Sequence, residues 1–419
     1  MAMTGLALRS VWNRRFTAGL TVLAIALSVT MLLGVEKLRA DARDAFANTL
    51  SGTDLIVGAR SGAVQLLLYS VFRIGSATNN ISWRSYQALS QHPRVSWSVP
   101  ISLGDSHRGY RVLGTTTEYF QRYRHAREQS LRFAAGAPFL DLFDAVLGAE
   151  VAQRLGYAVG DPLVVAHGAG QVSFVNHDDK PFRVAGILAR TGTPVDRTVH
   201  VSLQGIEAMH VDWHAGAPVP GRRIGAEQAR SMELTPRTIT AFLIGLSSRT
   251  AVFSVQRAIN EYREEPLLAI IPGVALQELW DLMGVAERAL RVIAAMVVVT
   301  GMLGMLTVIL ASLDARRREM AVLRSVGARP AHVFALFVSE AALLATLGCA
   351  LGVALLYAAV LAGAPVLARE FGLYLPPPAL GLRDAALLGA VVLAGLVAGT
   401  VPALRAYRLS LSDGLSMRI

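Results

Sequence analysis

The run VIAAMVVVTGMLGMLTVILASL occupies residues 292–313 and contains no charged side chain over 22 residues. A helix needs about 20 consecutive apolar residues to cross the hydrocarbon core of a bilayer. This run therefore predicts a membrane-spanning helix. Three further charge-free runs of comparable length lie at residues 16–35, 341–368 and 385–404. The sequence predicts an α-helical membrane protein with four transmembrane helices.

The composition of the 419 residues agrees with this prediction and excludes several classes of protein. Hydrophobic residues make up 53% of the chain and charged residues only 17%, below the roughly 25% of typical soluble domains. The single cysteine, Cys349, excludes internal disulfides and C-x-x-C metal or redox sites. The two lysines, Lys37 and Lys180, do not follow glycine, so the chain has no G-x-x-x-x-G-K-[ST] phosphate loop. It is not a self-sufficient P-loop ATPase.

Basic residues predict the orientation in the membrane, because cytoplasmic loops of membrane proteins carry an excess of Lys and Arg. They gather in the N-terminal arm, in the loop between spans two and three, and in the tail. These residues are Arg9, Arg14, Arg15, Arg316, Arg317, Arg318, Arg324, Arg329, Arg405, Arg408 and Arg418. Both termini and the middle loop are therefore expected in the cytoplasm. The net charge of +10 reflects topology, and we expect no nucleic-acid partner.

The expected order of segments follows from the spans and their orientation. The first apolar run is too long for a cleavable signal peptide, so we expect it to remain as an anchor. The segments are an N-terminal arm with the first span (1–35), an extracytoplasmic domain with stalk helices (36–291), the second span (292–313), a cytoplasmic coupling helix or loop (314–332), the third span (333–368), a short extracytoplasmic loop (369–384), the fourth span (385–404) and a cytoplasmic tail (405–419).

The long segment between spans one and two predicts an α+β domain. EKLRADARDAFANTL (36–50) and ALQELWDLMGVAERAL (275–290) continue the adjoining spans as polar or amphipathic helices, and two such helices would form a stalk. Between them, short β-rich runs alternate with turns. The expected strands are residues 53–59, 94–103, 110–116, 161–166, 181–189, 198–203, 238–246 and 267–271, with helices at 146–156 and 249–262.

Two features of this domain have open interpretations. The apolar segment SGAVQLLLYSVFRIG (61–75) fits either a lid or interfacial helix or, more commonly for a short apolar run, a core helix. The lid interpretation involves Leu66, Leu67, Leu68, Tyr69 and Phe72. His210 and His214 in HVDWH share one helix face, which suits a metal. No third ligand has a diagnostic spacing, so solvent-exposed histidines are the commoner explanation and no metal is assigned.

The string RRREMAVLRSVGARPAHVFALFVSEAALLATLGCALG, residues 316–352, carries a family resemblance. It closely resembles the permease signature of the FtsX/MacB-type ABC transporter family, in which R-R-x-E-[IM]-x-x-L-R-[AS]-[VLI]-G-A-x follows the second span. The tail VPALRAYRLSLSDGLS (401–416) is similar to the end of the family's fourth span, with Leu411 and Gly414 where proline and alanine are commoner. LGAEVAQRLGYAVGDPLVV (147–165) also matches, as in architectures like those of LolC and LolE.

The resemblance implies a dimer of four-span subunits, formed by two copies or by two related permeases, each docked on a cytoplasmic ATPase that binds ATP and Mg²⁺. Because this chain has no phosphate loop, we expect a separate ATPase chain and no cofactor here. The family's coupling helix corresponds to residues 314–329, where Met320, Leu323 and Val326 form an apolar stripe and Gly327 ends the helix. The expected ATPase-coupling residues are Arg316, Arg317, Arg318, Glu319, Met320, Leu323, Arg324 and Gly327.

Polar and small residues within the spans complete the candidate sites. Glu340 is an intramembrane carboxylate, for which we favour a structural role over a proton relay because no second buried acid accompanies it. Small residues four apart allow helices to approach closely, within a subunit or between subunits. They are Gly348 and Gly352 in span three and Gly395 and Gly399 in span four.

The expected function is that of a permease subunit in a bacterial inner-membrane ABC transporter of the mechanotransmission type. Its cargo would be a lipoprotein, lipid, peptide or small amphiphile, with a periplasmic partner protein and membrane lipid as further contacts. One alternative is a non-transporting, FtsX-like regulator of a cell-wall hydrolase. Another is export of a metal-linked or heme-type substrate. An enzyme is not expected, because the chain has no nucleophile elbow, HExxH motif or spaced carboxylate pair.

Overall fold

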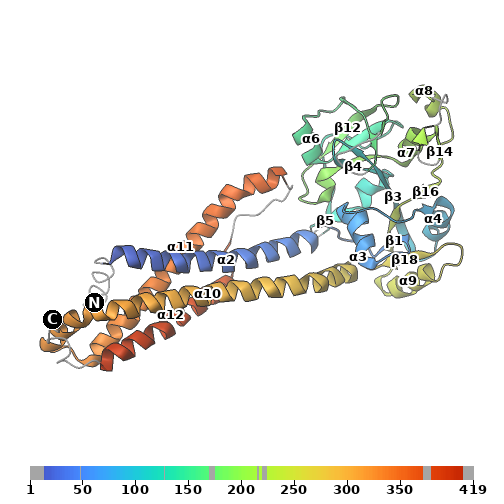
Figure 1. The fold of residues 1–419 in the computed structure, drawn as a ribbon. Helices are drawn as coiled ribbons and strands as arrows, with labels where there is room; N and C mark the ends of the chain where they lie inside the picture. The colour runs from blue at the N-terminus through green and yellow to red at the C-terminus, as the bar shows by residue number, and fades with distance from the viewer. Residues whose placement is uncertain are drawn as a thin grey trace. The chain divides into compact units, whose positions relative to one another are not determined.

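The computed structural model describes residues 14–47, 49–126, 128–168, 175–214, 217–218, 224–370 and 379–408. The chain forms two compact units, which we describe separately. The first comprises Met1–Asp41 with Gly284–Ile419, and the second comprises Ala42–Met283 (Figure 1). The expected arm before residue 14, the loop at 371–378 and the tail after residue 408 lie outside the described residues.

Long helices build the first unit. They are α2 (Arg15–Ala47), α10 (Pro272–Ser325), α11 (Pro330–Glu370) and α12 (Leu382–Arg408). Each contains a stretch long and apolar enough to cross a membrane, so the four expected spans are confirmed. Side-chain hydroxyls join the helices, because Ser28 Oγ donates to Val297 O at 3.2 Å and Thr30 Oγ1 donates to Gly352 O at 3.0 Å. Their buried apolar faces form one core, which includes Ile25, Val29, Met305, Ile309, Phe337, Leu344 and Ala403.

Helices α2 and α10 continue past their apolar stretches, as the stalk prediction requires. Arg39 Nε lies 2.7 Å from Glu287 Oε2 in the first unit. In the second unit the Phe46 and Trp280 ring centroids are 5.5 Å apart, and the Arg43 guanidinium lies 5.3 Å from the Trp280 ring centroid. Ionic and aromatic contacts therefore hold the two helices side by side. Helix α10 has no proline after Pro272, and the glycines within it do not interrupt the helix.

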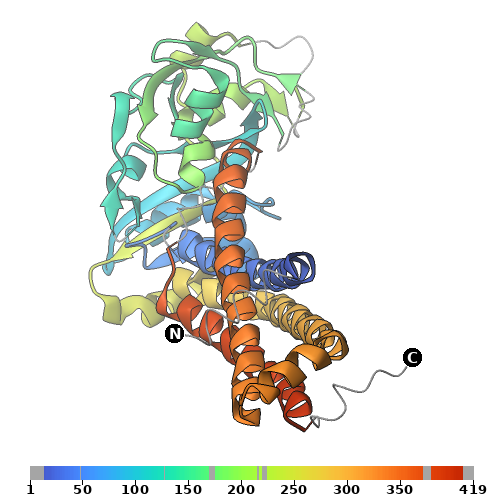
Figure 2. The same ribbon diagram turned by 90° about the vertical axis from the view of Figure 1, so that its left-hand side faces the viewer.

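One 12-stranded mixed sheet organises the second unit. In their order across the sheet the strands are β18 (Leu267–Ile270), β1 (Leu55–Ala59), β17 (Ala241–Leu246), β3 (Val95–His107), β4 (Tyr110–Thr115), β13 (Thr198–Ser202), β8 (Asp144–Leu147), β12 (Phe182–Leu188) and β7 (Phe133–Gly136). Additional strands are β10 (Ala166–His167), which pairs with β3 and β11 (Val175–Asn176), and β9 (Pro162–Leu163), which pairs with β12. Strand β3, with 13 residues, is the longest of the described strands. It is drawn in cyan in Figure 2.

Shorter elements cover the sheet. The helices are α3 (Ala63–Leu67), the π-helix η1 (Leu68–Phe72), α4 (Trp83–Ser90), α5 (Glu118–Arg122), α6 (Ala149–Leu155), the 3-10 helix η2 (Pro194–Arg197), α7 (Leu203–His210), α8 (Ala226–Arg230), the 3-10 helix η3 (Arg249–Ala251) and α9 (Val252–Asn260). Two-stranded pairs are β2 (Ile81–Ser82) with β16 (Thr238–Ile239), β5 (Arg124–His125) with β6 (Gln129–Ser130), and β14 (Trp213–His214) with β15 (Ala217–Pro218).

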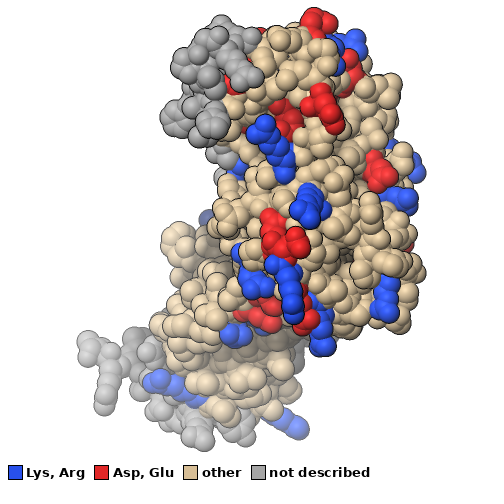
Figure 3. Space-filling model, turned by 90° about the vertical axis from the view of Figure 1, so that its right-hand side faces the viewer, with Lys and Arg blue, Asp and Glu red and all other residues tan. Residues whose placement is uncertain are grey.

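Strand periodicity distributes apolar side chains to both faces of the sheet. In β8, Ala145 and Leu147 join one core while Val146 joins another, because successive side chains on a strand point to opposite faces. The expected α+β domain with helical extensions is confirmed. On the face drawn in Figure 3, acidic and basic side chains are interspersed without a broad basic patch.

His200 provides a pH-dependent test of this core. It is fully buried on β13, its ring centroid lies 5.4 Å from that of Tyr119, and burial lowers its pKa from 6.5 to about 3. As pH falls below 6.5, the unfolded chain binds a proton at this histidine that the folded chain does not bind. Stability should therefore fall by about 1.4 kcal/mol per pH unit until pH approaches 3.

We expect His200→Phe to preserve the aromatic packing and to remove this contribution. Thermal midpoints of the full chain in detergent, measured from pH 7 to pH 4, should decline less steeply in the variant than in the wild type. Parallel declines would show that His200 titrates with its ordinary pKa in the folded chain.

Candidate functional site

The expected coupling region is not a separate helix. Residues 314–325 form the end of α10, which is continuous with span two over 54 residues. The sequence DARRREMAVLRS consists mainly of good helix formers and has no breaker, so α10 ends only before Gly327, whose φ of 99° suits a glycine after a helix. Helix α11 then begins at Pro330, three residues earlier than the predicted start of span three.

The residues of the apolar stripe predicted for this region differ in their exposure to solvent. Met320 is 6% exposed and packs in the helix core, whereas Val326 in the turn is 84% exposed. Met320 therefore cannot enter a partner's groove without unpacking, and Val326 can. The side chains of Arg316, Arg317, Arg318, Glu319, Leu323 and Arg324 lie outside the described ones.

Glu340 lies on α11, ten residues after its start, and is 7% exposed.

The four candidate packing glycines lie at contacts between helices of this chain. A methyl group at Gly348 would lie 2.5 Å from Ile25 Cγ2, and one at Gly352 would lie 2.7 Å from Ala26 O, both on α2. A methyl group at Gly395 would lie 2.7 Å from Ala345 Cβ, and Gly399 likewise faces Ala341 on α11. These glycines therefore pack α11 against α2, and α12 against α11.

The apolar segment 61–75 packs as core. Leu66, Leu67 and Tyr69 are at most 2% exposed, and Leu68 and Phe72 are half-buried. The first three cannot contact lipid or cover a substrate in this structure, which argues against the lid interpretation. Gly58 permits this packing, because a side chain there would meet Leu66 and Tyr69.

A cavity of about 230 Å³ adjoins the π-helix η1. Arg73 and Arg111 line it together with Tyr69 and Leu103. Arg111 donates to Gly75 O at 2.9 Å and Arg73 lies 3.5 Å from the Tyr119 hydroxyl. Both cations are therefore partly engaged, and the cavity combines apolar walls with positive charge.

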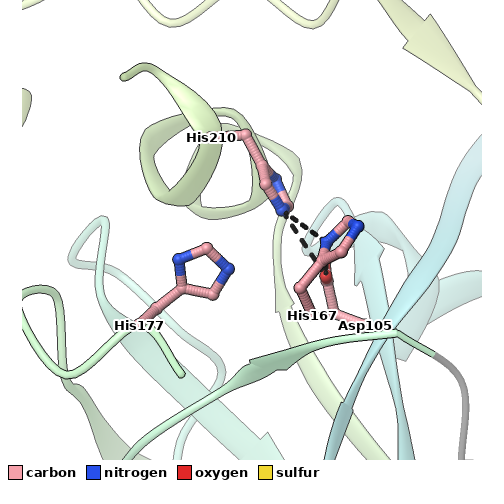
Figure 4. Close-up of side chains that lie close together, drawn as sticks. All are labelled: Asp105, His167, His177 and His210. Carbon is pink, nitrogen blue, oxygen red and sulfur yellow. Dashed lines mark hydrogen bonds and ion pairs between the residues drawn. The ribbon is translucent and has the colours of Figure 1, made fainter. Parts of the chain in front are cut away.

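A compact group of metal-ligand side chains lies elsewhere in the second unit. Asp105, His167, His177 and His210 each offer one ligand atom, and these atoms all lie within 4.8 Å of one another (Figure 4). His210 was a candidate from sequence, but its expected companion His214 is not in this group. The i, i+4 spacing does not hold on one helix, because α7 ends at His210 and His214 lies on β14.

Strand register brings the first three side chains together. β10 pairs with β3 so that His167 is opposite Asp105. β10 also pairs with β11, which ends at Asn176, and the His177 amide donates to Val165 O at 3.0 Å. His210 is the last residue of α7. Spacing along the sequence could not reveal this group, because consecutive members are separated by 10 to 62 residues along the chain.

Three side chains of this cluster have shifted pKa values. Burial acts to raise the pKa of Asp105, but hydrogen bonds with His167 and His210 outweigh it and lower that pKa to about 2. Burial lowers the pKa of His177 to about 4. For His210, burial acts to lower the pKa, yet interaction with Asp105 is stronger and the pKa is raised.

Lys180 forms a buried ion pair beside this cluster. It is 1% exposed, and its Nζ lies 2.9 Å from Asp212 Oδ1 and 3.0 Å from Asp179 Oδ2. We expect Lys180→Met to destabilise the fold by about 3–5 kcal/mol, because it leaves Asp212 buried without its cation. Thermal unfolding of the full chain measures this loss. The double variant Lys180→Met with Asp212→Leu should recover most of it, and no recovery would contradict the pairing.

Comparison with known proteins shows matches along most of the chain. Residues 18–265 match the MacB-like periplasmic core domain, and residues 291–411 match the FtsX-like permease C-terminal family. The macrolide export ATP-binding/permease protein MacB of Nitrobacter winogradskyi is 25% identical over 378 residues, which cover 85% of this chain and 53% of that protein. MacB 1 of Yersinia pestis bv. Antiqua is 25% identical over 325 residues, which cover 77% and 46%.

This chain spans about half the length of the curated relatives it matches. Among solved structures, the periplasmic region of MacB from Actinobacillus actinomycetemcomitans matches 55% of this chain and 94% of its own length, with 11% identity and a TM-score of 0.34.

Proposed function

Because this chain belongs to the FtsX/MacB-type family of ABC transporter permeases, we propose that it couples ATP hydrolysis to motion of its α/β domain. The ATPase that binds ATP and Mg²⁺ lies outside these 419 residues. One observation carries the proposal. Helix α10 begins in the α/β unit, contains an apolar stretch able to cross a membrane, and ends beside the exposed turn at Val326. A force applied at this turn can pass along one continuous element.

The proposed orientation places the 326–329 turn and both termini in the cytoplasm of a bacterial inner membrane. The α/β domain then lies on the periplasmic side. The support is the positive-inside rule, because arginines precede the first span and five further arginines lie within residues 316–329. The turn then faces the compartment that contains the ATPase.

The proposed cargo is moved outside the bilayer and not through the spans. The charge-free runs at 16–35, 292–313, 341–368 and 385–404 offer no charged lining, and Glu340, which lies within the expected third span (333–368), is the exception. A polar route through lipid normally requires ionisable or polar side chains. A lipoprotein, lipid, peptide or amphiphile such as the macrolide named for the relatives suits this arrangement. A second permease copy or a related permease, and a periplasmic protein, complete the proposed assembly.

Reconstitution tests the proposal against the regulatory alternative. The full chain and its ATPase are placed in proteoliposomes, and ATP hydrolysis is measured with and without a macrolide, a lipopeptide or a diacyl lipoprotein. We expect one of these amphiphiles to stimulate hydrolysis at least twofold. Hydrolysis that responds to none of them, but does respond to an added cell-wall hydrolase, would favour the regulator.

A further inference from the structure

The cluster of Asp105, His167, His177 and His210 has the composition of a transition-metal site. Three imidazoles and one carboxylate converge from β3, β10, the residue after β11, and the end of α7. Three nitrogen ligands with one oxygen, in tetrahedral arrangement, are typical of zinc. We propose that these four side chains bind one divalent transition-metal ion, for which zinc is the best match.

Distances within the cluster fit this ion. His167 Nδ1 lies 3.1 Å from Asp105 Oδ1 and 3.2 Å from His210 Nε2. His210 Nε2 lies 3.5 Å from Asp105 Oδ1. Ligands bonded to zinc at 2.0–2.1 Å are separated by about 3.3 Å along the edges of a tetrahedron. The spacing of these three atoms therefore matches one face of a zinc tetrahedron.

The tautomer of His210 points to the same conclusion. Its Nδ1 lies 2.9 Å from Ile206 O, and a carbonyl can only accept a hydrogen bond. Nδ1 therefore carries a proton, so Nε2, which lies 3.5 Å from Asp105 Oδ1 and 3.2 Å from His167 Nδ1, is the ring nitrogen that could bind a metal. Metal-binding histidines commonly have this second hydrogen bond from the other ring nitrogen to a carbonyl. A metal ion at this position would replace the protons that hold the three side chains together through hydrogen bonds.

His177 supplies the fourth ligand. The residue is 2% exposed, and its Nε2 is buried without a hydrogen-bond partner among the described residues. A buried ring nitrogen of this kind costs free energy unless something occupies it. Figure 4 shows a nitrogen of this ring turned toward the other three side chains. Its ligand atom lies within 4.8 Å of the other three, so a small movement of the ring would give the four atoms the spacing that zinc requires.

An aromatic side chain borders the site. The Trp213 ring centroid lies 4.7 Å from that of His167, 5.0 Å from that of His177 and 5.2 Å from that of His210, so one aromatic side chain orients all three imidazoles. The nearby Lys180 cation is paired with Asp179 and Asp212, which limits its repulsion of a metal ion. The bound ion would fasten β10 and the segment after β11 to α7. This inference does not depend on coupling to an ATPase.

Metal content and stability test the site directly. The tag-free full chain in detergent is stripped with EDTA, mixed with zinc chloride, separated from free ion and measured by elemental mass spectrometry. We expect about one zinc per chain. His177→Ala is the sharpest variant, because His177 Nε2 has no hydrogen bond to lose. It should weaken zinc binding about 100-fold or more in competition with a fluorescent chelator, since even outer-shell changes cost 10–100-fold.

A matched histidine outside the cluster provides the control. His92→Ala, at a half-buried position between α4 and β3, should bind zinc as the wild type does. Zinc should also raise the thermal midpoint of the wild type and of His92→Ala, but not that of His177→Ala. Absence of stoichiometric zinc in the wild type, or unchanged affinity in His177→Ala, would overturn the assignment. His210→Ala provides a second test through a ligand on another element.

Discussion

Replacing Val326 by aspartate is expected to abolish ATP-driven activity while leaving the fold intact. Val326 is 84% exposed in the turn between α10 and α11, so the substitution removes no internal packing. Burying a valine at a partner's groove stabilises docking by about 1.5–3 kcal/mol, and an unpaired charge there adds a further penalty. Docking of the ATPase should weaken at least about 10-fold.

The measurement is the rate of ATP hydrolysis that depends on this chain in proteoliposomes, together with the amount of ATPase that copurifies. Val159→Asp is the matched control, because Val159 is a 45% exposed valine in a turn of the α/β unit. It should behave as the wild type. Equal losses in both variants would indicate a general defect, and normal activity in Val326→Asp would exclude this turn as the docking element.

Gly352→Leu is expected to disrupt the helix bundle. Even a methyl group at this position would lie 2.7 Å from Ala26 O and 2.8 Å from Val29 Cβ on α2. The Gly352 carbonyl also accepts the hydrogen bond from Thr30 at 3.0 Å. Overpacking typically costs 1–3 kcal/mol, and a larger loss is expected here because one of the obstructing atoms belongs to the backbone.

Gly363→Leu on the same helix is the control, because a side chain at Gly363 has nothing within 4 Å. The thermal midpoint of monodisperse protein in detergent should fall by several degrees or more for Gly352→Leu and remain unchanged for Gly363→Leu. If both variants melt as the wild type does, α2 and α11 do not pack through this glycine.

The spans and the strands of five or more residues could be predicted because their signals are local. An uninterrupted apolar run such as residues 292–313 needs no tertiary information to indicate a span. Short strands such as β8 are harder to predict: Val146 and Leu147, the second half of β8, belong to the helical pattern expected at 146–156, whereas α6 begins only at Ala149. A strand this short is defined by its neighbours, β13 and β12.

The metal-ligand cluster could not be predicted, because it depends on long-range register. His167 lies opposite Asp105 because β10 pairs with β3 in this register. This register cannot be read from the residues between them in the sequence. The histidine pair with helical spacing, His210 and His214, was the visible signal, but α7 stops between its members. The family resemblance suggested a coupling helix at 314–329, and residues 314–325 are helical as the last part of α10; the coupling role stays a prediction.

The central proposal is that ATP binding moves the α/β domain through α2 and α10, and a distance measurement across these helices tests it most directly. Spin labels at Leu38 and Leu282, which are 59% and 69% exposed, are introduced after Cys349→Ala removes the single native cysteine. The full chain is reconstituted with its ATPase, with labelled chains diluted among unlabelled ones. Double electron–electron resonance spectroscopy should show a shifted distribution of distances between the two labels when ATP and vanadate trap the closed ATPase. The Val326→Asp variant should suppress this shift. Identical distributions with and without nucleotide would contradict the account.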